Sequence, residues 1–131
     1  MVPGIEEFYQ IIGSSIVAAI PEKWTHAKMY AVFYSDHILY DGEYLLLNGE
    51  KRSFSTPIEA ERAFRRIREL FKEAQQPLWC RASFELTPEG KFSTKWGYDD
   101  CDEKGFARFN EEADKKWRDA QWESLKRNPT S

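Results

Sequence analysis

The sequence lacks the long apolar runs and the leader pattern that mark membrane and exported proteins. No apolar stretch approaches the roughly 18–20 residues that a bilayer-spanning helix needs. Glu6 and Glu7 occupy the N-terminal stretch where a signal peptide would carry basic residues. We therefore expect a protein of the cytoplasm that makes no contact with a membrane.

Cysteine and histidine, the residues of many nucleophilic and metal sites, are scarce. Cys80 and Cys101 have no CxxC spacing and make no disulfide framework. Cys80 follows Trp79 in an apolar stretch, as a small core residue does, and the carboxylates around Cys101 disfavour its thiolate. His26 and His37 belong to no GxSxG, HxxxH or nucleotide-binding motif. We therefore expect no enzymatic activity, no cofactor and no bound metal.

The sequence also lacks an excess of positive charge. Its 19 Lys+Arg against 22 Asp+Glu give a formal net charge of −3, so the whole chain does not attract a polyanion such as nucleic acid. It is rich instead in aromatic residues, which make up 15% of 131 residues. Such a composition excludes disorder, and the length predicts a single domain over residues 1–131.

Three segments have the three- and four-residue apolar spacing of amphipathic helices. The first covers about 4–19. The second begins after a cap at Ser55 or Thr56, with Pro57 in its first turn. The third is predicted over about 103–126, and a frayed tail follows it. The apolar stripe of this third helix consists of Phe106, Phe109, Ala113, Trp117, Ala120 and Ser124.

The remaining segments predict strands in two hairpin groups. Alternation over 26–34 places two sets of side chains on opposite faces of a strand, Met29, Ala31 and Phe33 on one and Tyr30, Val32 and Tyr34 on the other. Asp41-Gly42 and Asn48-Gly49 are turn dipeptides, and the second joins strands at 43–47 and 50–54. The role of residues 37–40 stays open.

A second hairpin follows the second predicted helix. Its strands contain Trp79, Phe84 and Leu86, then Phe92 to Trp96, around a turn at 88–90. The order is therefore α-βββ-α-ββ-α. Strands that arrive as hairpins form a largely antiparallel sheet, here of about five strands, with helices packed on it, so the fold class is α+β.

Four segments carry a resemblance to a known family. Pro21-Glu22-Lys23-Trp24 leads into the strand at Met29-Tyr30-Ala31-Val32, and a capped helix starts at Thr56-Pro57. Gln76-Pro77-Leu78-Trp79 then precedes a hairpin that ends in Trp96-Gly97-Tyr98-Asp99-Asp100. Residues 5–100 thereby resemble the YezG-like family of bacterial immunity proteins and antitoxins. The helix from about 103 lies outside the pattern that carries this resemblance.

The resemblance implies a protein that binds and neutralises a cognate toxin domain. Such toxins are typically delivered to neighbouring cells by a secretion system, in contact-dependent competition, and many are nucleases. The implied mechanism is stoichiometric occlusion without catalysis or cofactor. Two alternatives remain: a regulatory module that binds a peptide at an exposed sheet edge, and a small hydrolase that uses His26 or His37.

The predicted toxin contact is an acidic run made of Asp99, Asp100, Asp102 and Glu103. Nuclease active sites are electropositive because they bind phosphates, so clustered carboxylates can occupy them and steer association. Two other interpretations stay open. The acids can cap the following helix through its dipole, or bind Mg²⁺ or Ca²⁺, although the spacing of a calcium loop is missing.

Two aromatic residues and one basic face complete the candidates. Trp122 lies off the stripe of the last helix, which suits either an exposed anchor for the toxin or a ring folded over the core edge. Tyr98 lies beside the acids and either contacts the partner or closes the hairpin end. The basic face of the second helix either touches nucleic acid or pairs with glutamates of its own helix, as the net charge favours; it carries Arg62, Arg65, Arg66, Arg68 and Lys72.

Overall fold

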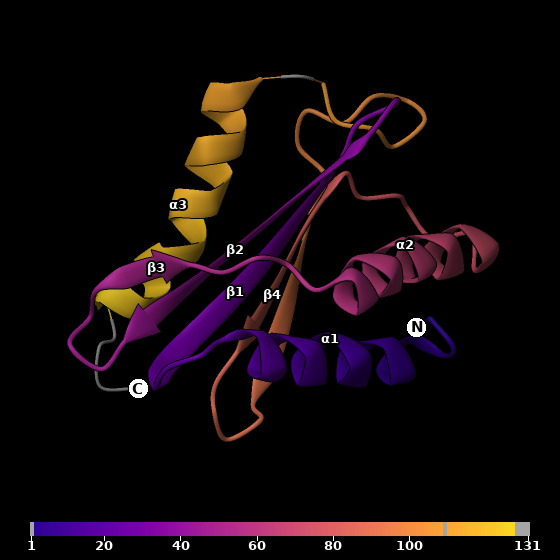
Figure 1. Ribbon diagram of the computed structural model, residues 1–131. Coiled ribbons are helices and arrows are strands. Elements are labelled where there is room, and N and C mark those ends of the chain that lie inside the picture. The colour runs from indigo at the N-terminus through magenta and orange to yellow at the C-terminus, as the bar shows by residue number, and fades with distance from the viewer. Residues whose placement is uncertain (1, 109, 128–131) are drawn as a thin grey trace.

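The computed structural model describes residues 2–108 and 110–127 (Figure 1). The elements follow the predicted order α-βββ-α-ββ-α, and the fold is α+β as expected. The helices are α1 (Ile5–Ala19), α2 (Ile58–Glu73) and α3 (Glu111–Arg127). The strands are β1 (Trp24–Phe33), β2 (Ile38–Leu46), β3 (Lys51–Ser53), β4 (Arg81–Leu86) and β5 (Phe92–Gly97).

The five strands form one antiparallel sheet in the order β3-β2-β1-β4-β5. β1 lies at the centre, where Met29 stands opposite Gly42 of β2 and Phe84 of β4. The predicted alternation of β1 is confirmed, because Met29, Ala31 and Phe33 join one apolar cluster while Val32 and Tyr34 join another on the opposite face.

α1 and α2 lie on the same face of the sheet and enclose the main core (Figure 1). Phe64 and Ile67 of α2 are fully buried there, together with Trp79, whose ring stacks on Trp96 at 4.7 Å between centroids. Ile12 and Ile16 of α1 are equally buried. Burial of these large apolar side chains supplies most of the hydrophobic stabilisation of the fold.

α3 covers the opposite face of the sheet (Figure 1), and polar groups of both layers meet there. Tyr30 meets the Trp117 ring edge-on at 6.3 Å between centroids. Among the residues whose burial the structure describes, the buried polar and charged ones lie on the strand face beneath α3 or on α3 itself; they are Lys28, Arg81, Ser83, Asp114 and Gln121. This second layer therefore combines buried charged groups with aromatic rings.

Asp41-Gly42 is not a turn, which corrects the sequence-based prediction. Both residues lie inside β2, and residues 38–40 extend that strand. A glycine is needed at position 42 for another reason, because a Cβ atom there would lie 2.6 Å from the Phe54 ring. Asn48-Gly49 does form the predicted turn, with Gly49 at a φ of +88°.

Two predicted helix starts are also wrong. Thr56 does not cap α2: its hydroxyl instead donates to the Glu61 carboxylate at 2.5 Å, and Pro57 occupies the cap position. α3 begins at Glu111 rather than near 103, because Gly105 adopts a φ of +82° and interrupts a helix there. Phe109, placed on the predicted stripe, and the tail at 128–131 lie outside the described residues.

Candidate functional site

The acidic loop, residues 98–103, follows β5 directly and projects three of its carboxylates into solvent. Asp99, Asp100 and Glu103 are exposed, and the Tyr98 side chain beside them is 48% exposed. Asp100 has a φ of +58°, a left-handed conformation that aspartate accepts more readily than most residues. The loop therefore presents an aromatic ring and several negative charges on one stretch of backbone.

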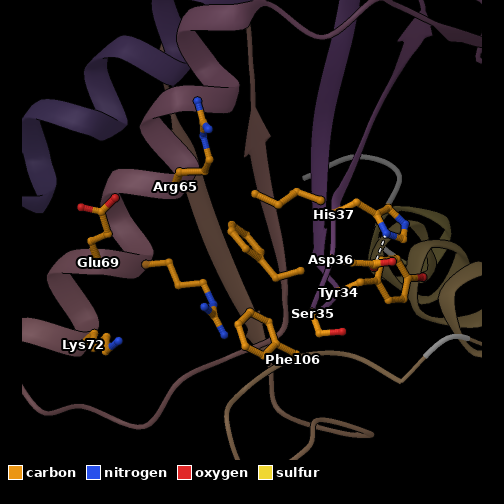
Figure 2. A pocket seen from close by; sticks show the side chains of 11 residues that line it. Tyr34, Ser35, Asp36, His37, Arg65, Glu69, Lys72 and Phe106 are labelled. Atoms are coloured by element: carbon orange, nitrogen blue, oxygen red, sulfur yellow. Dashed lines mark hydrogen bonds and ion pairs between the residues drawn. The ribbon is translucent and has the colours of Figure 1, made fainter.

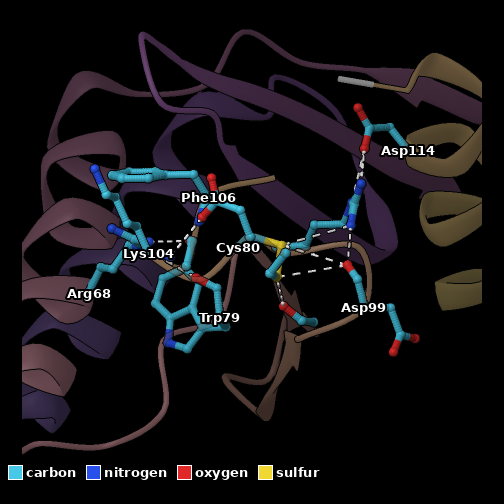
Figure 3. The surroundings of a disulfide bond; sticks show 12 residues. Arg68, Trp79, Cys80, Asp99, Lys104, Phe106 and Asp114 are labelled. Atoms are coloured by element: carbon cyan, nitrogen blue, oxygen red, sulfur yellow. Dashed lines mark hydrogen bonds and ion pairs between the residues drawn. A yellow bond between two sulfur atoms is a disulfide. The ribbon is translucent and has the colours of Figure 1, made fainter. Parts of the chain in front are cut away.

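A disulfide holds this loop against the sheet (Figure 3). Cys80 and Cys101 are bonded to each other, which the sequence analysis did not foresee. The pairing of β4 with β5 explains the bond: Arg81 stands opposite Gly97, so the chain leaving β5 returns beside Cys80. The Cys80 side chain is buried, as predicted, but as half of a cystine.

Two arginines hold the acidic loop and the turn that follows it from opposite faces of the sheet. Arg81 donates to the Asp99 carbonyl oxygen at 2.7 Å, and Arg68 of α2 donates to the Gly105 carbonyl oxygen a few residues further on. Gly105 allows the second contact, since a Cβ atom there would lie 2.9 Å from the Arg68 guanidinium. Because the backbone is held at several points, little conformational entropy is lost when the loop binds a partner.

Asp102 has a structural role that separates it from the other acids. Its carboxylate accepts hydrogen bonds from the backbone N–H groups of Lys104 and Phe106, both at 2.9 Å. These bonds, first of all the one from Phe106, hold the pKa of Asp102 below its usual range. The carboxylate of Asp102 thus shapes the turn, and the free charge of the loop resides on Asp99, Asp100 and Glu103.

The acidic loop does not cap α3. The cap is Asn110, whose Oδ1 accepts a hydrogen bond from the Ala113 N–H at 3.1 Å. Glu111, Glu112 and Asp114 supply the acidic first turn that complements the helix dipole. The cap interpretation of residues 99–103 is therefore wrong, and no intramolecular helix end accounts for their charge.

Trp122 is not an exposed anchor. Its side chain is only 4% exposed, its indole N–H donates to the Glu43 carboxylate at 3.1 Å, and the Lys28 ammonium lies 4.7 Å from its ring centroid. The alternative of a ring folded over a buried layer describes it better. Trp122 therefore has no place in a contact surface for a partner.

A family model for the YezG-like immunity proteins matches residues 5–127. The chain belongs to this family. The match continues through α3, beyond the stretch that carried the resemblance in the sequence. No curated protein matches the chain.

Membership in the YezG-like immunity family supports a role as an immunity protein, which implies a toxin as partner. Proteins of this kind are generally not enzymes, and the cysteines agree with that: bonded to each other, they offer no thiolate to a histidine. Asp36 and His37 form an exposed pair at 2.7 Å, and His26 contacts the Thr25 hydroxyl at 3.3 Å. In the described residues neither histidine contacts a cysteine or a serine.

The YezG-like chain shows no metal site in its described part. Among residues 2–108 and 110–127, no group of three or more His, Cys, Asp or Glu side chains is arranged to hold an ion. Within the same residues no helix is both long and apolar enough to cross a membrane.

The sequence did not predict a buried hydrogen-bond network that lies beneath α3. Arg81 forms two hydrogen bonds with one Asp114 carboxylate oxygen, at 2.9 and 2.7 Å, and the Tyr34 hydroxyl donates to the other oxygen. All three side chains are buried. Alternating charges in a strand usually face water, so only the helix that covers this face explains why Arg81 is buried.

The basic face of α2 pairs only in part with its own glutamates. Arg66 bonds to Glu69 at 2.5 Å, whereas the Glu61 carboxylate accepts a hydrogen bond from the Thr56 hydroxyl. Arg68 is half-buried and its guanidinium binds backbone oxygens. Arg65 and Lys72 are exposed and take part in no ion pair within the described residues.

Proposed function

We propose that this protein neutralises a cognate bacterial toxin by stoichiometric occlusion, with the acidic loop as the principal contact. The supporting observation is the set of three free carboxylates beside Tyr98, on a loop fixed by a disulfide and two arginines. Such a loop loses little entropy on binding, and its charge raises the rate of encounter with a basic surface.

The toxin that fits this loop is a nuclease. Nuclease active sites are electropositive because they hold the phosphates of the substrate, and carboxylates on a fixed loop can occupy that space. Tyr98 supplies the kind of aromatic side chain that anchors protein interfaces. In this proposal the toxin enters from a neighbouring cell through a secretion system, and the immunity protein waits in the cytoplasm of the cell that it protects. Because that compartment is reducing, the backbone contacts of Arg81 and Arg68 hold the loop there when the disulfide is open.

Charge reversal at the loop tests the proposal. The toxin probe is the domain encoded next to this gene, made with its active site inactivated for binding and intact for protection assays. We expect Asp99→Lys/Asp100→Lys to slow association about tenfold or more at low ionic strength. Raising the salt concentration should shrink the difference, because exposed charges are screened.

Glu6→Lys/Glu7→Lys is the matched control, since it changes the net charge equally on the exposed surface of α1. This control variant should associate with the toxin as fast as the parent protein. Equal association rates for the loop variant and the control at low salt would remove the acidic loop from the interface. Failure of the parent protein to protect cells from any neighbouring toxin gene would contradict the function itself.

A peptide-binding module at a sheet edge is the second candidate, and one feature favours it. β5 is an edge strand, and Phe92 at its start is 45% exposed beside a groove of about 350 Å³ between α1 and β5. An extended segment could add to this edge through backbone hydrogen bonds. Thr94→Pro would then abolish binding while the charge variants of the acidic loop bind normally.

A further inference from the structure

A second groove, which we name the α2 groove, lies between α2 and the turn that joins β1 to β2 (Figure 2). Its volume is about 430 Å³. Figure 2 shows Arg65, Glu69 and Lys72 on the helix side, with Asp36 and His37 across from them. Phe106, which follows the acidic loop, lines one end, so the groove adjoins the proposed toxin contact.

One wall of the α2 groove carries a row of positive charge. Arg65, Arg68 and Lys72 follow one another at steps of three and four residues, so they lie along one side of α2 over roughly 10 Å. Arg68 is occupied, since its guanidinium donates to the carbonyl oxygens of Trp79 and Gly105. The two outer cations are exposed and enter no ion pair within the described residues.

The floor of the α2 groove is apolar, and its far rim carries the Asp36 carboxylate. The Arg68 guanidinium lies 5.0 Å from the Phe33 ring centroid and 4.7 Å from that of Phe106. On the rim, the Asp36 carboxylate is 2.7 Å from the His37 ring nitrogen, and the His37 ring stacks on Tyr34. Glu69 on the helix side is paired with Arg66, so the three cations Arg65, Arg68 and Lys72 outnumber the remaining carboxylate of the lining, Asp36, and the groove is positive overall.

We infer that the α2 groove binds an acidic segment of the partner protein, with two carboxylates on Arg65 and Lys72 and an apolar side chain against the partly exposed Phe106 ring. That this partner is the toxin rests on the proposed function. The toxin would then present a basic surface to the acidic loop and an acidic segment beside it. Such a two-sign contact fixes orientation and rejects toxins in which only one of the two surfaces matches.

A nucleic acid is a poorer occupant of the same groove. Its backbone carries a negative charge at every nucleotide, and a strand that left the groove would meet Asp99, Asp100 and Glu103 of the adjoining loop. The chain also carries a net charge of −3. A short protein segment places its carboxylates only where the groove is positive, so charge complementarity favours a protein partner.

The test uses the intact protein and three blocked pentapeptides, observed by amide chemical-shift titration. The probe Glu-Glu-Leu-Glu-Glu carries both features of the inferred segment, Glu-Glu-Gly-Glu-Glu lacks the apolar group, and Lys-Lys-Leu-Lys-Lys reverses the charge. We expect shifts at residues 35–38 and at Phe106 with the first peptide, at least about threefold weaker binding of the second, and none of the third.

Two double variants with equal charge change decide which cations bind. Arg65→Glu/Lys72→Glu should weaken binding of Glu-Glu-Leu-Glu-Glu about tenfold or more. Arg62→Glu/Lys116→Glu reverses exposed cations that do not line the groove, and should change the affinity less than about twofold. Equal losses in both variants would overturn the inference, as would tighter binding of a pentathymidine oligonucleotide at the same residues.

Failure of the groove and failure of the proposed function give different results. If the peptide does not bind while the protein still blocks the toxin through Asp99 and Asp100, only the α2 groove is discarded. If the peptide binds but no neighbouring toxin is neutralised, binding at the α2 groove is supported and the immunity function is contradicted. In the toxin complex, Arg65→Glu/Lys72→Glu should accelerate dissociation, because lost contacts act mainly on the off-rate.

Discussion

The two faces of the sheet are covered in different ways, although β1 supplies residues to both. Met29 and Phe33 pack under α1 and α2, within a core of aliphatic and aromatic side chains. On the other side, Lys28 lies beneath α3, where its ammonium donates to the Gln121 carbonyl oxygen and faces Glu85 at 3.6 Å. Burial lowers the pKa of Lys28, and Glu85 opposes that change.

The difference between the faces teaches what each layer requires. An apolar core accepts many residue combinations of the right volume, whereas buried ions are stable only with each partner in place. The acidic loop draws on both layers, because Arg68 reaches it from the apolar side and Arg81 from the ionic side. A change in either layer can therefore reach the proposed toxin contact.

The largest expected effect lies on the apolar face. Phe64 is 1% exposed in the middle of α2, so Phe64→Ala should lower the free energy of unfolding by about 3–5 kcal/mol. Urea unfolding measures the change. Ile58→Ala is the control on the same helix, because Ile58 is 60% exposed and its loss should cost less than about 0.5 kcal/mol. A loss below about 1 kcal/mol for Phe64→Ala would mean that this face is not the main core.

The sheet face beneath α3, which we call the ionic face, should respond differently to substitution. Asp114→Ala leaves the Arg81 guanidinium buried without its carboxylate, which should cost about 3 kcal/mol in urea unfolding. The double variant Arg81→Met/Asp114→Leu removes both charges and should recover most of that loss. A double variant no more stable than Asp114→Ala would show that the pair contributes more than mutual neutralisation. No double variant of this kind would rescue Phe64→Ala.

The sequence predicted the apolar face far better than the ionic one. Helical and strand periodicity located the elements and placed Met29 and Phe33 on one side of β1, because apolar residues that recur with the period of an element mark its buried face. Lys28 and Arg81 carry no such mark, since a charged residue in a strand ordinarily faces water. Their burial depends on α3, whose own apolar periodicity is weak.

The sequence predicted the acidic run, but it did not predict how the loop that carries these residues is built. Asp99, Asp100 and Glu103 are exposed as an interface would require, whereas Asp102 turned out to build the loop. The disulfide depends on strand register, which places Cys101 beside Cys80 and which spacing in the sequence does not show. The packing of α3 on the sheet, which the sequence does not show either, places Trp122 against Lys28 rather than solvent.

The disulfide lies where the ionic face meets the acidic loop, and its removal should have an intermediate effect. It closes a loop of 21 residues in sequence separation, so Cys80→Ala/Cys101→Ala should lower the free energy of unfolding by about 2–3 kcal/mol. Urea unfolding with and without a thiol reductant measures it. Reductant should destabilise the parent protein and leave the variant unchanged; a parent protein indifferent to reductant would contradict a role of the bond in stability.

The smallest effect concerns two tyrosines, one on each face. Burial first, then the bond to Asp114, raises the pKa of Tyr34 on the ionic face to about 12, and burial raises that of Tyr40 on the apolar face to about 12. An unfolded tyrosine has a pKa of about 10. Between these values the folded state keeps protons that the unfolded state has lost, so stability falls as pH rises from about 10 to 12.

Tyr34→Phe and Tyr40→Phe separate the two contributions. Each variant loses one hydrogen bond, to Asp114 or to the Glu61 carbonyl oxygen, which should cost about 1 kcal/mol at neutral pH. Each variant should also lose less unfolding free energy than the parent protein between pH 8 and pH 11, as measured by urea unfolding. If Tyr34→Phe reduces this loss and Tyr40→Phe does not, alkaline pH loosens α3 while α2 stays in place, and the two layers open separately. Equal reductions would mean that both layers unfold as one cooperative unit, because a proton lost on either face then acts on the same transition.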